Sequence, residues 1–229
     1  MDRISDIAAL DQPHRRALYA LLTERRDWLG RDEAADALDM ARSVAAFHLD
    51  KLADAGLVDV RYERPPGRTG PGAGRPAKQY RRSANEVSVS LPDRHYDLAG
   101  ALLADAVAEA TATGRPVDVA LREAAHLAGC EMGNEVRESL PKRRSAAAVK
   151  RAAMAALGRL GYEPFAEGRD IVLANCPFHA LAERHRPLVC GMNLDLLGGL
   201  AEALDEEERL TPRLDPQPGM CCVRVRVSA

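Results

Sequence analysis

The chain of 229 residues has no apolar run that approaches membrane-spanning length, and its first residues lack the pattern of a signal peptide. We therefore expect a cytoplasmic protein with no membrane association. Lysine is scarce, at four residues against 28 arginines, and alanine is abundant. This bias is typical of a GC-rich genome, so an arginine in place of a lysine does not by itself indicate function. The sequence also lacks an internal repeat.

Hydrophobic residues make up 46% of the chain, enough to bury a core in two modest domains or one large one. The net charge of -2 is unevenly distributed. Residues 61–82 hold seven basic residues and one acidic residue, Glu63, whereas residues 83–229 are net acidic. A basic block on a near-neutral protein favours a DNA-reading module joined to a part that does not touch DNA; the alternative is a solvated loop. The basic residues of the block are Arg61, Arg64, Arg68, Arg75, Lys78, Arg81 and Arg82.

The first 82 residues carry the pattern of a winged helix-turn-helix. Helical spacing of apolar residues predicts helices over 4–26, with a break at Asp11-Gln12-Pro13, and over 31–38 and 42–55. Gly56 would end the third helix. Strands are expected at 57–62 and 78–82, on either side of a Pro- and Gly-rich segment.

The third helix is the candidate recognition helix, because one face is apolar and the opposite face is polar. Ala45, Leu49 and Leu52 share the inner face. Phe47 on the outer face would contact a thymine methyl group, or alternatively pack against the wing or a neighbouring helix. For His48, at the boundary of the inner face, we expect a structural role. The candidate DNA-binding residues of this helix and the wing are Arg42, Ser43, Phe47, Lys51, Arg75, Lys78 and Arg81.

The rest of the chain alternates helical and strand patterns, so we predict an α+β fold. A strand is expected at 86–91, and the later elements are helices at 95–112, 118–139 and 144–160, strands at 162–166 and 170–174, two helices, and a terminal strand. We expect three parts: a winged helix-turn-helix domain at 1–85, a strand and helical linker or dimerisation region at 86–140, and a Cys-rich α+β sensor domain at 141–229.

Five cysteines in a cytoplasmic protein favour metal, cluster or redox chemistry over structural disulfides. Cys176 and His179 have Cys-x2-His spacing, and Pro177 would start a helix that aims both side chains at one point. Together with Cys190 and a cysteine of the terminal strand they form a candidate metal site. Strand alternation directs Cys221 inward and leaves Cys222 more accessible, so the preferred set is Cys176, His179, Cys190 and Cys222, with Cys221 or His185 as substitutes.

Other interpretations of these residues stay open. Free cysteines can be small buried hydrophobic residues. Cys130 follows His126 by four residues, a pair that could bind metal, although a buried thiol beside a surface histidine is the simpler expectation. A Cys–His pair can also support nucleophilic catalysis. No oxyanion-forming glycine loop or third orienting group is evident, so we expect no enzyme.

Residues 8–82 resemble the winged-helix repressors of the ArsR and DeoR families through LDQPHRRALYALL, ARSVAAFHLDKLADAGLV and GRPAKQYRR. The resemblance implies a homodimer on a palindromic double-stranded DNA operator. The NCPF…H and LVC motifs and the terminal Cys-bearing strand extend it to SufR-type regulators, although the regular series of four cysteines in that family is not reproduced. This second resemblance implies a repressor with an iron–sulfur cluster of unknown type. Zinc, or a small-molecule sensor domain, is the alternative.

Overall fold

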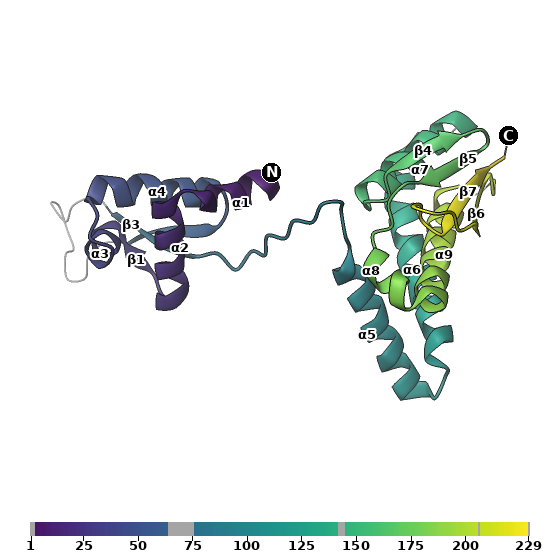
Figure 1. Cartoon of the computed structure of the whole chain (residues 1–229), viewed down its shortest axis with the longest axis horizontal. Coiled ribbons are helices and arrows are strands. Elements are labelled where there is room, and N and C mark those ends of the chain that lie inside the picture. The colour runs from purple at the N-terminus through teal and green to yellow at the C-terminus, as the bar shows by residue number, and fades with distance from the viewer. Residues whose placement is uncertain (1–2, 64–75, 142–144, 206, 229) are drawn as a thin grey trace. The chain divides into compact units, whose positions relative to one another are not determined.

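The computed structural model describes residues 3–63, 76–141, 145–205 and 207–228. It divides into two compact units, Met1–Val89 and Ser90–Ala229, shown in Figure 1. Helices dominate both units and each contains one small antiparallel sheet, so the fold is α+β, as predicted.

The N-terminal unit consists of three α-helices of the helix-turn-helix type, a short leading helix and a three-stranded sheet. Its α2 helix begins at Pro13, where Gln12 caps the helix by accepting a hydrogen bond from the Arg15 amide at 2.8 Å. Its sheet has the order β1-β3-β2. The elements are α1 (Arg3–Ala8), η1 (Ala9–Asp11), α2 (Pro13–Arg25), β1 (Leu29–Gly30), α3 (Arg31–Ala37), α4 (Arg42–Asp54), β2 (Val58–Glu63) and β3 (Ala77–Arg82).

The core of this unit forms where α2 and α4 pack against the sheet. The side chains of Leu18, Leu22, Leu49, Leu52 and Tyr80 are fully buried. The predicted inner face of α4 is therefore confirmed. After α4 the chain turns through Gly56, whose φ of 69° is a conformation that glycine adopts without steric cost, and enters β2.

Two details of this half differ from the prediction. Strand β1 was not anticipated, because two residues give no periodicity and the strand exists through its pairing with Gln79 and Tyr80 of β3. The strand predicted at 86–91 is wrong, since these residues form no strand. Val87 packs on the N-terminal core while Leu91 is 79% exposed, so the apolar alternation does not reflect one buried face.

The C-terminal unit packs four longer helices and one short helix with a sheet of order β4-β5-β7-β6. Strand β6 was not predicted, and β7 begins only at Val223, so Cys221 and Cys222 precede the terminal strand instead of lying on it. The elements are α5 (Tyr96–Thr113), α6 (Val117–Glu138), α7 (Ala146–Arg159), β4 (Pro164–Glu167), β5 (Asp170–Leu173), α8 (His179–Arg184), α9 (Arg186–Leu204), β6 (Leu210–Leu214) and β7 (Val223–Val227).

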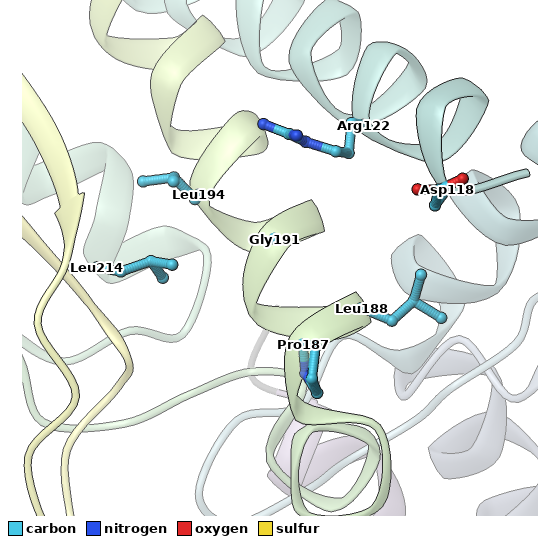
Figure 2. Close-up of a pocket in the computed structure, with 7 residues that line it drawn as sticks. All are labelled: Asp118, Arg122, Pro187, Leu188, Gly191, Leu194 and Leu214. Carbon is cyan, nitrogen blue, oxygen red and sulfur yellow. The ribbon is translucent and has the colours of Figure 1, made fainter. Parts of the chain in front are cut away.

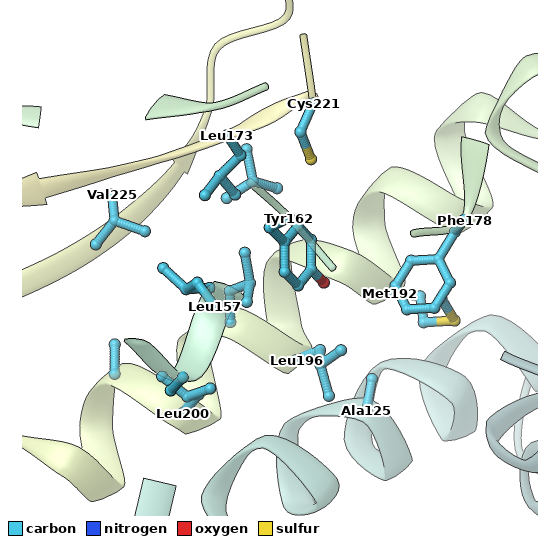
Figure 3. Close-up of a cluster of buried hydrophobic side chains, with 14 of the residues drawn as sticks. Ala125, Leu157, Tyr162, Leu173, Phe178, Met192, Leu196, Leu200, Cys221 and Val225 are labelled. Carbon is cyan, nitrogen blue, oxygen red and sulfur yellow. The ribbon is translucent and has the colours of Figure 1, made fainter. Parts of the chain in front are cut away.

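One core joins α5, α6, α7, α9 and the sheet. Figure 3 shows Leu196 and Leu200 of α9 beside Ala125 of α6, with Tyr162 between α9 and the sheet. The region 86–140 is therefore not a separate linker: the unit boundary falls between residues 89 and 90, and α5 and α6 share the core of the C-terminal sheet.

Helices α6 and α9 approach each other backbone to backbone. A Cβ atom added at Gly129 would lie 2.0 Å from the carbonyl oxygen of Leu196, and one at Gly199 would lie 2.0 Å from that of His126. Such contact excludes any larger residue at either position without displacement of the helices. The α6–α9 pair is accordingly a rigid centre for this unit.

Helix α9 is also long and apolar enough to cross a membrane by length and composition. The expectation that no apolar segment approaches this length is corrected here. However, 56% of its apolar window is buried inside the unit, as the central helix of a folded core would be.

Candidate nucleic-acid interface and cysteine cluster

The outer face of α4 is open to solvent. Arg42 and Ser43 are exposed in its first turn, Lys51 is exposed one turn before its end, and Phe47 is 57% exposed between them. Because the opposite face is buried, these four side chains are the ones that a DNA major groove could reach. All four were predicted from the sequence.

The basic residues of this face are paired with acidic neighbours. Arg42 binds Asp32 of α3, which raises the pKa of the guanidinium further above its usual value through hydrogen bonding and charge attraction. Lys51 lies 3.2 Å from Asp54. Ion pairs as exposed as these contribute little to stability, so DNA phosphates can replace the acidic partners.

Lys78 differs from the other predicted DNA contacts, because it ties the wing to α4. Its Nζ lies 2.7 Å from Oδ1 of Asp50, and the Tyr80 hydroxyl donates to the same oxygen at 2.8 Å. Burial raises the pKa of Asp50, but these hydrogen bonds lower it by more, so the carboxylate stays ionised. We name Asp50, Lys78 and Tyr80 the Asp50 clamp. No local pattern predicts this contact, since Asp50 lies 28 residues from Lys78.

Phe47 and His48 form an aromatic contact between α4 and α2. The His48 ring stacks on His14 with centroids 5.4 Å apart, and Phe47 meets His48 edge-on at 5.1 Å. Burial, and then the charges of His14 and Arg15, lower the pKa of His48. A structural role for His48 therefore agrees with its position, while Phe47 both packs on His48 and remains open to solvent.

Sequence reasoning missed an aromatic and basic cluster on the sheet. The guanidinium groups of Arg61 and Arg81 lie 4.5 and 4.6 Å from the centroid of the Trp28 ring. Arg81 also lies 3.6 Å from Asp59. Trp28 is the single tryptophan of the chain, which was the available signal. Of the other predicted wing residues, Arg75 lies outside the described residues, as do Arg64 and Arg68.

In the C-terminal unit, four cysteines from three segments lie together. Cys176 follows β5, Cys190 is on α9, and Cys221 and Cys222 precede β7. Cys221 lies close enough to Cys176 and Cys222, and Cys222 to Cys190, for one thiol to shift the pKa of the other. We call these four residues the cysteine cluster. Cys222 is half-buried and the other three are buried, in agreement with the predicted directions of Cys221 and Cys222.

The thiol pKa values in the cysteine cluster are raised. Hydrogen bonding to Cys221 and burial raise the pKa of Cys176, and burial raises that of Cys190. The hydrogen bond from Cys176 lowers the pKa of Cys221, yet Cys222 and burial outweigh it and bring it to about 11. Neighbouring thiolates repel each other in a poorly solvated site, so several can ionise together only beside a cation.

Buried polar groups hold the cluster in place. The Asn193 amide on α9 donates to the Cys221 sulfur at 3.3 Å, and the buried Tyr162 hydroxyl donates to the Asn193 oxygen at 2.5 Å. The Cys221 amide donates to the carbonyl of Leu173 at 2.9 Å. Figure 3 shows Cys221 beside Tyr162 and Leu173 at the edge of the core.

The structure does not bring the predicted histidines to these thiols. His179 begins α8 with an exposed side chain that lies 3.3 Å from Glu183, and His185 is exposed between α8 and α9. The predicted ligands that do come together are Cys176, Cys190 and Cys222, and the substitute Cys221 joins them. Cys221 thus lies with the three predicted cysteines and the two histidines do not, while the metal-ligand set itself stays a prediction.

Soft thiolate donors fit the ligand chemistry of an iron–sulfur cluster or of zinc. Within the described ranges, no three His, Cys, Asp or Glu side chains are already grouped in a metal-holding arrangement. The sulfurs form a chain of pairwise contacts, so common ligation requires the thiol side chains to rotate toward one point.

Cys130 is separate from this cluster. Its sulfur lies 3.6 Å from Nε2 of His126, which in turn is 3.4 Å from a carboxylate oxygen of Glu202. Burial and the Glu202 charge raise the pKa of Cys130. The thiol is half-buried and the histidine is at the surface. This is close to the simpler expectation, a buried thiol beside a surface histidine.

Comparison with known proteins identifies one part of the chain. Residues 10–61 match a helix-turn-helix domain. The match runs from η1 to β2, so it contains α4 and its exposed face. It supports a DNA-binding transcriptional regulator. No curated protein and no solved structure matched the chain.

The helix-turn-helix domain matches under a quarter of the chain, and the second strand of the wing, β3, follows it. The net charge of α3 and α4 indicates why DNA binding would depend on the wing. Residues 31–54, which contain α3 and α4, carry six acidic and three basic residues. A net-negative pair of helices needs positive charge from elsewhere to approach DNA phosphates, and the sequence carries such charge in residues 61–82.

A cavity of about 490 Å³ lies at the surface of the C-terminal unit, between α6, α9 and β6 (Figure 2). It was not foreseen from the sequence, because its walls come from three segments that are far apart in the chain. The residues that line it are Asp118, Arg122, Pro187, Leu188, Gly191, Leu194 and Leu214.

Proposed function

We propose that this chain is a cytoplasmic, homodimeric transcriptional repressor that binds a palindromic DNA operator and holds an iron–sulfur cluster on its C-terminal cysteines. The state of the cluster would set the operator affinity. The observation that carries the proposal is the convergence of four cysteines from three segments in a unit that follows a helix-turn-helix domain.

DNA recognition rests on the exposed face of α4. Arg42 can pair with a guanine edge or a phosphate, Ser43 with either, and Phe47 with a thymine methyl group. The Asp50 clamp fixes the angle between α4 and β3, so the helix and the basic strand would face DNA in one fixed arrangement. Lys78 acts in this scheme as a positioning residue for the wing.

The cysteine cluster brings together three segments of the C-terminal unit that are far apart in sequence. When bound, an iron–sulfur cluster supplies a redox-active group that is held by thiolates. Ligation would fasten the segment before α8 and the segment before β7 to Cys190 of α9. Because α9 packs backbone to backbone on α6, a shift of α9 must displace α6 as well.

A homodimer is supported by apolar side chains that stay exposed on the long helices. Val107 of α5 is 53% exposed and Leu127 of α6 is 57% exposed. A second copy of the chain that covers such side chains would transmit a shift of α6 to the spacing of the two recognition helices. Helices α5 and α6 are therefore our candidates for the dimer contact.

A structural zinc ion is the alternative occupant, since the same four sulfurs fit it and zinc is redox-silent. The regulator would then be a winged-helix protein with another signal. We do not propose an enzyme: a catalytic thiol needs a depressed pKa, whereas the pKa values of Cys176, Cys190 and Cys221 are raised.

The test is an anaerobic absorption spectrum of the purified protein with iron, sulfide and zinc measured on the same sample. We expect visible absorption with stoichiometric iron and sulfide in the wild type and in Cys130→Ser, whose thiol lies outside the cluster. Cys176→Ser and Cys190→Ser should lose the absorption. If the variants keep the wild-type iron and sulfide, the cluster proposal is wrong; a colourless protein with one zinc that also resists reconstitution would leave the zinc alternative.

A further inference from the structure

The 490 Å³ cavity has the size and the lining of a small-molecule site (Figure 2). Ligand cavities commonly measure about 300–1,000 Å³ and combine apolar walls with few polar groups. Here the walls are Pro187, Leu188 and Leu194 of α9 and Leu214 of β6. Leu188 is 39% and Leu214 is 50% exposed, so a ligand that covers them removes apolar surface from water.

Gly191 keeps the cavity open. In the middle of an α-helix, glycine costs about 1 kcal/mol relative to alanine. A Cβ at this position would meet nothing within 4 Å, so packing against the protein does not require a glycine. Its lack of a side chain instead leaves the α9 wall of the cavity free.

The two charged groups of the cavity are not equivalent. Arg122 forms a salt bridge with Asp195 of α9, in which Nε lies 2.6 Å from Oδ2 and Nη2 lies 3.3 Å from Oδ1. The side chain of Asp118, one helical turn before Arg122, makes no ion pair within 4 Å and no hydrogen bond among the described residues, although its charge contributes to the raised pKa of Arg122. The charge available to a ligand is therefore the carboxylate of Asp118.

We propose that the cavity binds a small amphipathic cation, with its apolar body against Leu188, Leu194 and Leu214 and its ammonium group beside Asp118. Asp118, Arg122 and the Asp195 that pairs with Arg122 together carry one net negative charge, which favours a cationic ligand over an anionic or a neutral one. Size, lining and available charge thus select a protonated amine with an apolar body.

Two of the cavity residues are linked to the cysteine cluster through the backbone. Gly191 is adjacent in sequence to Cys190, and the residue after Leu214, Asp215, donates its amide to the carbonyl of Cys222 at 2.8 Å. If the proposed function holds, the amine would act as an effector of the regulator. Binding itself depends only on the C-terminal unit and can be tested without DNA.

The experiment compares three probes of equal size in titrations of the full-length protein followed by amide NMR: 2-phenylethylamine, 2-phenylethanol and phenylacetate. We expect the amine to bind most tightly, with the largest shifts at Leu188, Gly191 and Leu214. Phenylacetate should bind most weakly. Tighter binding of phenylacetate, or shifts spread away from the cavity for the amine, would overturn the proposal.

Two variants locate the site. Gly191→Leu should weaken the binding of the amine and of the alcohol by more than about tenfold, because the new side chain takes the space of the ligand. Burying two fewer methylene groups of the ligand is already enough for about a tenfold loss. Asp118→Asn should weaken the amine about three- to fivefold, as expected of an exposed ion pair, and leave the alcohol unchanged. Asp105→Asn, an exposed acid of α5, is the matched control and should change neither. Equal effects of Asp118→Asn and Asp105→Asn would contradict the assignment, whatever the outcome for DNA binding.

Discussion

Asp170 shows at the scale of one residue how the small C-terminal sheet is held together. Its carboxylate accepts hydrogen bonds from Arg213 of β6 at 2.7 Å and Arg226 of β7 at 2.5 Å. Arg224 lies 3.9 Å away. These hydrogen bonds, first from Arg213 and then from Arg226, hold the pKa of Asp170 far below its usual range, against the effect of burial. One carboxylate thereby joins three strands.

We predict that Asp170→Asn lowers the free energy of unfolding at pH 6 by about 1–2 kcal/mol, the range for charged hydrogen bonds whose partners are partly exposed. The depressed folded-state pKa means that this stabilisation is complete above the unfolded-state value near 4 and is lost as the pH falls toward the folded-state value. Urea unfolding should therefore show the difference between wild type and Asp170→Asn shrinking below about pH 4.

The control for this prediction is Glu167→Gln. Glu167 lies 2.9 Å from Arg224, but its side chain is 59% exposed, so its loss should change the unfolding free energy by under about 0.5 kcal/mol. A difference between wild type and Asp170→Asn that stays constant down to pH 3 would contradict the assigned role of the carboxylate.

At the scale of elements, a substitution of Asp50 distinguishes its role in positioning the wing from the effect of its charge on DNA binding. Asp50→Asn removes a negative charge from α4, which by itself should favour DNA binding. The clamp predicts the opposite: loss of the Lys78 and Tyr80 contacts releases the wing and weakens operator binding about fivefold, near 1 kcal/mol.

Asp54→Asn provides the matched control, because it removes the same charge from the same helix and frees Lys51. Its operator affinity should stay equal or rise. Fluorescence anisotropy on specific and random duplexes distinguishes the cases, since Asp50→Asn should lower the ratio of specific to non-specific affinity. Equal behaviour of the two variants would show that the clamp does not position the wing.

The α6–α9 pair gives a second prediction for elements. In Gly129→Ala the new Cβ would lie 2.0 Å from a backbone oxygen, so the helices must separate, and we expect about 1–3 kcal/mol of destabilisation in urea unfolding. Gly191→Ala, on α9 with nothing within 4 Å of its Cβ, should be neutral or stabilising by up to about 1 kcal/mol. Similar losses in both variants would mean that helix propensity, not close packing, governs this pair.

Local patterns explain which elements could be predicted. The inner face of α4 follows from the spacing of Ala45, Leu49 and Leu52, and the helix end follows from Gly56. Strands β1 and β6 carry too few residues for a pattern and exist through pairing. Alternation placed the sulfur of Cys221 inward, yet only the fold shows that Cys176 meets it there.

The two units of the whole molecule carry different charges. Residues 1–89 hold 15 basic and 14 acidic residues, and the remainder is net acidic. Positive charge that could attract DNA is therefore concentrated in residues 61–82, while the C-terminal unit is net acidic and less suited to DNA contact. In the proposed homodimer, a signal from the cysteine cluster would pass through α9 and α6 to the spacing of the two helix-turn-helix domains.

Such coupling has a bounded size. A change of about 1–3 kcal/mol between two dimer arrangements alters operator affinity roughly 5–150-fold. The most direct measurement is the anaerobic anisotropy titration of an operator, selected from randomised duplexes, before and after removal of the cluster. Our account predicts a change within that range for the wild type and for Cys130→Ser, and none for Cys190→Ser. An operator affinity that stays constant in the wild type while iron and sulfide are lost would contradict it.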